Sequence, residues 1–231
     1  MKTSRLHSAF TLIELIAVIT IISILMALLL PYIAGAKESA RRTEAGVAIR
    51  DVANACRSYY TDYSKFPPVD AAKNTAAATT NGYMSFGDKT NGKCKVENNV
   101  LFDILRGISR GDNVDHIYNK RQQKYISQKK AVDKKLPRNG FVDGSEFPAA
   151  QAGQLMDPWG AQYCIILETD GNEEIDMSDF FTDLTGASNV VRHTAVGFSM
   201  GKDSKIGGKD YENKLRKPNS TEAHDDVVSW E

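Results

Sequence analysis

The chain has 231 residues, with 29 basic and 29 acidic side chains, so its formal net charge is zero. A neutral chain gives no reason to expect a nucleic-acid-binding surface, and short basic runs such as residues 120–124 are expected to be solvated. Three cysteines are too few for a disulfide framework. The length suits one membrane anchor and one domain of ordinary size.

Residues 10–30 form a nearly unbroken apolar run. A helix of this length spans roughly 30 Å, the thickness of the hydrocarbon core of a bilayer, so the run is expected to be a transmembrane helix. Glu14 is the one ionisable residue in it. A carboxylate costs several kcal/mol to bury in lipid, so it is usually retained for a partner or a task.

The residues before the run predict how it lies in a membrane. Lys2 and Arg5 make this end basic and no acid offsets them, which places the N-terminus in the cytoplasm and the later residues outside. A secretory signal peptide would have a small-x-small cleavage site after the run, and residues 28–31 offer none. Small residues, Ser8 and Ala9, stand before the run instead.

The segment from Ser8 to Leu15, SAFTLIEL, resembles the N-terminal processing motif of type IV pilins and of the pseudopilins of type II secretion systems. The resemblance implies that a prepilin peptidase cuts between Ala9 and Phe10 and methylates the new amino terminus. It also implies that Glu14 pairs with the amino group of Phe10 on an adjacent subunit, which would fix the stagger between subunits. A signal anchor, with Glu14 merely near the membrane surface, is the alternative.

Residues 31–66 predict an amphipathic continuation of the same helix, from about residue 10 to about residue 63. Pro31 and Gly35 are expected to weaken or bend it, and Phe66-Pro67-Pro68 is expected to stop it. Apolar residues recur at spacings of three and four, as on a helix with one buried face. They are Ala40, Val47, Ile49, Val52, Ala53, Cys56, Tyr59 and Tyr60.

Residues 67–154 are expected to form a variable loop and helical insertion. Residues 69–97 show no sustained apolar period, so they predict a loop. Asn98 to Gly107 predicts a short helix that starts at asparagine and ends at glycine. Residues 108–140 are polar and basic and predict little regular structure.

Residues 155–231 predict a small antiparallel sheet with a calcium loop as a possible addition. Asp157-Pro158-Trp159-Gly160 is typical of a turn, and residues 163–167, 193–198 and 227–230 predict short strands. The predicted fold class is therefore α+β, with a long N-terminal helix, its first half transmembrane, packed against a C-terminal antiparallel sheet. The pilin-like resemblance implies the same fold.

The C-terminal part is similar to the major pseudopilin of type II secretion, through residues 157–160, 198–203 and 225–230. The resemblance implies a calcium site made by the side chains of Asp203, Asp225 and Asp226 and the backbone carbonyls of Met200 and Ala223. Calcium prefers six to eight oxygen ligands, which clustered carboxylates and loop carbonyls supply. Residues 209–224 are an insertion relative to the family's compact loop, so ordinary surface acids remain the alternative.

The cysteines allow at most one bridge within the chain. Cys56 is predicted to lie on the long helix, so Cys94 with Cys164 is the preferred pair. Three unpaired thiols are the other interpretation.

Taken together, these patterns predict a structural subunit and not an enzyme, since no nucleophile elbow, P-loop or metal-hydrolase spacing occurs. The resemblance implies a pseudopilin of a periplasmic filament, anchored in the bacterial inner membrane. Its partners would be copies of itself, the peptidase, minor pseudopilins and the inner-membrane secretion platform. The alternatives are a type IV pilin of a surface fibre, used for adhesion, motility or DNA uptake, and an anchored binding or enzymatic domain.

Overall fold

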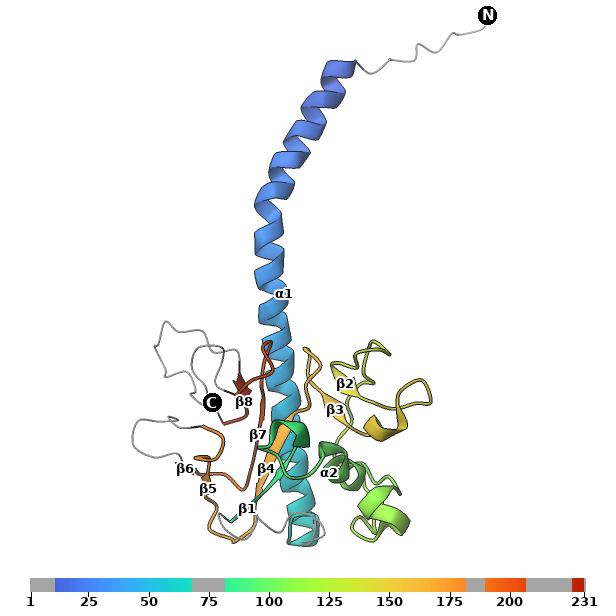
Figure 1. Cartoon of the computed structure of the whole chain (residues 1–231), viewed down its shortest axis with the longest axis vertical. Coiled ribbons are helices and arrows are strands. Elements are labelled where there is room, and N and C mark those ends of the chain that lie inside the picture. Colours follow the sequence, from blue (N-terminus) through green and yellow to red (C-terminus); the bar gives the residue numbers. More distant parts are fainter. Residues whose placement is uncertain (1–10, 68–81, 182–189, 207–225, 231) are drawn as a thin grey trace, which may run out of the picture. The chain divides into compact units, whose positions relative to one another are not determined.

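The computed structural model describes residues 11–67, 82–181, 190–206 and 226–230. The chain divides into two compact units, with the boundary between Arg41 and Arg42, and each is described by itself. The helix α1, Leu12–Tyr63, belongs to both units (Figure 1). It stays helical through Pro31 and Gly35, so the predicted continuous helix is confirmed.

The second unit contains a four-stranded antiparallel sheet with the strand order β1-β4-β7-β8. Its strands are β1 (Tyr83–Phe86), β4 (Cys164–Glu168), β7 (Ala195–Ser199) and β8 (Val227–Val228). Two smaller antiparallel pairs join β2 (Gly140–Phe141) to β3 (Leu155–Met156) and β5 (Ile175–Asp176) to β6 (Val190–Val191). The other helices are α2 (Asn98–Leu105) and the 3-10 helices η1 (Lys89–Asn91), η2 (Gly111–His116) and η3 (Ala149–Gln151). The fold is α+β, as predicted.

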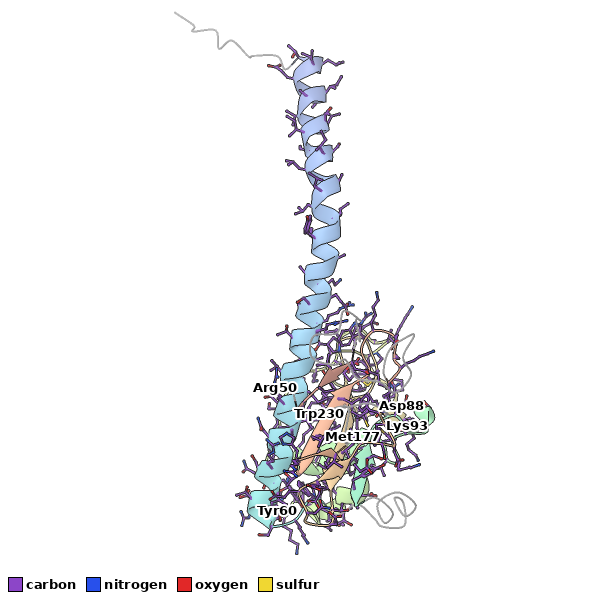
Figure 2. All side chains as sticks on the ribbon, turned by 90° about the vertical axis from the view of Figure 1, so that its left-hand side faces the viewer. Arg50, Tyr60, Asp88, Lys93, Met177 and Trp230 are labelled. Atoms are coloured by element: carbon purple, nitrogen blue, oxygen red, sulfur yellow. The ribbon has the colours of Figure 1, made fainter. Side chains whose placement is uncertain are left out.

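The C-terminal part of α1 lies alongside the sheet in both views (Figures 1 and 2). The helix comes close to β7 at Gly197, where an added Cβ would lie 2.8 Å from Cγ1 of Ile49. Figure 2 places Arg50 on the side of α1 that is turned away from the sheet. The glycine therefore removes the side chain that would hold the helix off the strand.

The buried face of α1 differs from the predicted one. It consists of residues spaced by three and four, and the fully enclosed members are Ala45, Ile49, Val52, Cys56 and Tyr59. Ala40, Val47 and Tyr60 were also expected to be buried, but all three are exposed. Val47 projects away from the stripe, because it is two residues from both Ala45 and Ile49, and two residues along a helix turn the side chain to the opposite face. Tyr60 directly follows Tyr59, so it lies at the edge of the stripe, where it stays exposed.

Residues 69–97 were predicted to be a loop, and this is wrong for β1. Its four residues pair with β4, with Tyr83 opposite Glu168 and Phe86 opposite Ile165. A strand this short, between polar stretches, has too few residues to show a period of two.

The helix α2 starts at Asn98, as predicted, and the side chain of this asparagine also joins separate parts of the fold. Asn98 is fully buried and donates from Nδ2 to the backbone carbonyls of Leu155 (2.9 Å) and Tyr163 (3.2 Å). The Leu155 N–H donates to Oδ1 of Asn98 (3.2 Å). The side chain thus joins α2 to β3 and to the start of β4.

Candidate functional site

The first turn of α1 contains the carboxylate that the sequence analysis singled out. Glu14 Oε2 accepts hydrogen bonds from the backbone N–H of Thr11 (2.8 Å) and from its hydroxyl (2.7 Å). The Glu14 N–H in turn donates to Oγ1 of Thr11 (3.3 Å). This reciprocal arrangement is a capping box, in which two residues three apart satisfy N–H groups that have no partner in the first turn of the helix. The sequence analysis missed it, although Thr-x-x-Glu before an apolar run is its signature.

Behind that turn, α1 presents apolar side chains on every side (Figure 2). Those of Leu12, Ile22 and Leu30 are 75%, 50% and 64% exposed, and the large apolar residues between them are exposed as well. This part of α1 is long and apolar enough to cross a membrane. Water is a poor solvent for such a surface, so it has to be covered by lipid or by other protein.

Besides Thr11, two hydroxyl groups lie inside the apolar run, and both are satisfied by the helix itself. Thr20 Oγ1 donates to the carbonyl of Ile16 and Ser23 Oγ donates to the carbonyl of Ile19, each at 2.7 Å. Such bonds allow serine and threonine to face lipid without a partner on another helix. Glu14 is therefore the one side chain of the run that carries a charge without an opposite charge in the run.

The predicted cleavage site, between Ala9 and Phe10, lies outside the described residues, and so does the predicted leader, residues 1–9. Glu14 lies within the first turn of α1. A cut at that position would create an amino group on the residue directly before Thr11. The new positive charge would then arise next to the N–H of Thr11, which Glu14 now caps.

The predicted calcium ligands fall partly within the described residues. Asp225 and Ala223 lie outside them. Within them, the β7–β8 register pairs Ser199 with Val227, so continuing it by one residue brings Met200 opposite Asp226. Asp203 follows three residues after Met200, in the turn that leaves β7.

Two of these carboxylates are partly enclosed. Oδ2 of Asp203 and Oδ1 of Asp226 are shielded from solvent, and Oδ1 of Asp203 accepts the backbone N–H of Lys205 (2.9 Å). Among the residues that the structure describes, no three or more metal-binding side chains form a group. The oxygen ligands present here, two carboxylates and the carbonyl of Met200, fit calcium in kind.

Asp157 supports the turn that follows β7, through a hydrogen bond to Ser199. This contact was not predicted from the sequence. Asp157 is fully buried, and Oδ1 accepts backbone N–H groups from Trp159 (2.9 Å), Gly160 (2.7 Å) and Ala161 (2.9 Å). Its Oδ2 accepts the hydroxyl of Ser199 (2.6 Å). Burial raises the pKa of Asp157, and these hydrogen bonds oppose the rise.

The connection continues beyond Asp157, because Ser199 Oγ also accepts the backbone N–H of Gly201 (3.1 Å). The turn at residues 157–160 and the exit from β7 are thereby held together. The signal in the sequence was the Asp-Pro-Trp-Gly turn, which predicted a bend but not its partner, Ser199.

Comparison with known protein families identifies the prokaryotic N-terminal methylation motif over residues 4–30. No curated protein and no solved structure matches the chain. The motif, followed by an exposed apolar helix, indicates a type IV pilin-like protein that is processed as a prepilin. This class of protein is structural, and the apolar helix fits anchoring in a membrane.

Proposed function

We propose that the chain is the major pseudopilin of a type II secretion system, the repeating subunit of a periplasmic filament that helps to move folded proteins out of the cell. The observation that carries the proposal is Glu14, an acidic residue at the first turn of an otherwise apolar and exposed helix, inside a methylation motif. The similarity of residues 157–160, 198–203 and 225–230 to the major pseudopilin favours secretion over a surface fibre.

Processing would give Glu14 its partner. Prepilin peptidase would remove residues 1–9 and methylate the amino group of Phe10. In the filament, that positive charge would meet Glu14 of an adjacent subunit inside a bundle of apolar helices. Two charges that are each costly to bury attract strongly where the dielectric constant is low, so the pair would favour one axial stagger.

The apolar surface of α1 would supply the cohesion. Before assembly it would lie in the inner membrane, with the N-terminus in the cytoplasm and the sheet-containing unit in the periplasm. After assembly, copies of the same surface would cover it, with minor pseudopilins and the inner-membrane platform as further partners. The capping box supports this order of events, since it satisfies Glu14 within the single chain until an amino group competes for it.

Substitution of Glu14 tests the proposal. Glu14→Ala is expected to enter the membrane and to be processed, but to form few or no filaments, because the amino group of Phe10 loses its counter-charge. Thr11→Ala is the matched control, since it removes the hydroxyl of the capping box and leaves the carboxylate in place. Membrane fractionation, mass measurement of the N-terminus and electron microscopy of sheared filaments give the readouts.

Three outcomes would contradict this scheme. Normal filaments from Glu14→Ala would disprove the charge pairing. A mature protein that still starts at Met1 would disprove the processing. Long fibres on the cell surface, together with normal secretion after deletion of the gene, would show a type IV pilin in place of a pseudopilin.

A calcium ion would complete the C-terminal loop in this proposal. The carboxylates of Asp203, Asp225 and Asp226, with the carbonyls of Met200 and Ala223, would hold it, and it would neutralise acids that otherwise repel one another. Millimolar calcium is expected to raise the melting temperature of the protein, and Asp203→Asn is expected to abolish most of the rise. No shift with calcium would show that these residues are surface acids.

A further inference from the structure

The two cysteines outside α1 face each other within the second unit. All three cysteines are buried thiols. Cys164 is the first residue of β4, Cys94 follows η1, and the two side chains are hydrogen-bonded to each other. Cys56 lies on α1 instead.

Gly87 lies directly beside both cysteines. A Cβ added to Gly87 would lie 2.6 Å from Sγ of Cys94 and 3.3 Å from Cα of Cys164. Residue 87 directly follows β1, whose last residue, Phe86, pairs with Ile165. Gly87 therefore leaves room for the side chain of Cys94 beside the backbone of Cys164.

The backbone holds both cysteines in place on either side of that glycine. The N–H of Gly87 donates to the carbonyl of Val96 (2.7 Å), and the N–H of Val96 donates to the carbonyl of Ser85 (3.2 Å). The segment that carries Cys94 thus runs beside the end of β1, while β4 pairs with the other edge of β1. The pair is set by the fold and not by a flexible loop.

We infer that Cys94 and Cys164 are a site of oxidative modification and form an intramolecular disulfide when the chain folds outside the cytoplasm. One Sγ–Sγ bond forms, both thiols lose their protons, and the two electrons pass to the disulfide of a protein thiol oxidant, which becomes a dithiol. In the cell this step rests on the proposed function, because only that proposal places the second unit in an oxidising compartment.

The bridge should form while the chain folds and not afterwards. Burial raises the pKa of Cys164 well above its usual value, and the hydrogen bond to Cys94 raises it further. A thiol that stays protonated attacks disulfides slowly, because the thiolate is the nucleophile. In the folded protein, two free thiols would be oxidised slowly. A disulfide between them would also be reduced slowly.

The first experiment counts thiols and does not depend on where the protein lies in the cell. Full-length protein in detergent is unfolded, reduced and refolded in a buffer of reduced and oxidised glutathione, and then alkylated under denaturing conditions with a maleimide that adds visible mass. One adduct per chain is expected without a reductant, on Cys56, and three are expected with one. Peptide mapping should find a linked pair of peptides that contain Cys94 and Cys164.

Single substitutions make the count specific. Cys56→Ser is the matched control, with no adduct expected before reduction, because the bridge remains. Cys94→Ser and Cys164→Ser should each leave two reactive thiols before reduction. The count is made on denatured chains, so it reads correctly even if a variant folds poorly. Loss of the bridge is expected to lower the melting temperature by about 5–10 °C.

Three adducts from refolded wild-type protein, a glutathione adduct on Cys94 or Cys164, or a bridge that includes Cys56 would each overturn the inference. A second experiment tests the cellular part by alkylating thiols in acid-quenched cells. If the refolded protein is bridged but the cellular protein has three thiols, the disulfide geometry stands and the periplasmic placement in the proposed function fails.

Discussion

The two parts of α1 show how one helix can serve two different environments. Up to about residue 33 its side chains are apolar and exposed all round, whereas from Ala45 onward only one stripe is apolar and that stripe is fully covered. The large apolar side chains described in the first part are exposed, so lipid or other protein has to cover them. The second part is stabilised by the sheet of its own chain. The difference shows that two parts of one unbroken helix can have entirely different surroundings.

The largest effect is expected when the same charge is placed in each part. Ile49→Asp would bury a carboxylate without a partner against Gly197 and is expected to cost about 4 kcal/mol or more, enough to unfold the second unit. Ile22→Asp should leave that unit folded and weaken retention in the membrane. Fluorescence of Trp159 and Trp230 during urea unfolding separates the two results. Equal loss of folding in both variants would refute the comparison.

A smaller effect is expected from removing methylene groups within the second part of α1. Ile49→Ala should lower the free energy of unfolding by about 2–4 kcal/mol, because it leaves a cavity against β7. Val47→Ala is the matched control: Val47 is 50% exposed, so a change below about 0.5 kcal/mol is expected. Urea titration in detergent measures both. A cost for Val47→Ala near that for Ile49→Ala would show that the buried stripe is wrongly placed.

Removing a polar group should also cost more stability in the second unit than in the apolar part of α1. Asn98→Ala removes three hydrogen bonds from a buried junction and is expected to cost about 2–3 kcal/mol. Thr20→Val removes a hydroxyl that only bonds its own helix, so unfolding of the second unit should not change. The same titration checks both. A stable Asn98→Ala variant would mean that water replaces the lost bonds.

The smallest effect concerns Glu44, which lies at the start of the second part. Partial burial alone would raise its pKa, but hydrogen bonds from Lys129 and Asn139 bring it below the usual value. A lowered pKa in the folded chain adds stability near neutral pH that is lost as the pH falls below about 4.5. Glu44→Gln should therefore cost less than about 1 kcal/mol at pH 7, because the pair is solvated. The cost should shrink as the pH falls below about 4.5, and a cost that is independent of pH would contradict the pairing.

Several helices and strands of the fold could be predicted from local sequence patterns. The extent of α1, the helix α2 and the strands β4, β7 and β8 follow from hydropathy, caps and β-branched runs. The strand β1 could not be predicted, because its four residues become a strand only through pairing with β4. The exposure of Val47 and Tyr60 likewise depends on which side of α1 the sheet covers, which local periodicity leaves open.

Some features of the candidate site could be predicted from the sequence, and others depend on the fold. Glu14 is evident in the sequence because a charge within an apolar run is conspicuous, and its capping partner was also readable from the spacing to Thr11. The meeting of Met200 with Asp226 depends on strand register, and the contact between Asp157 and Ser199 joins segments far apart in the chain. Spacing alone does not reveal such pairs.

The strand order β1-β4-β7-β8 is expected to limit the rate of folding. Tyr83 must find Glu168, and Phe198 must wait for Val228, which comes much later in the chain. Pairings across such long stretches form slowly, whereas a helix forms within microseconds. A chain tethered early by α1 would complete its sheet while already held away from its neighbours, so the anchor would also protect an unfinished domain from aggregation.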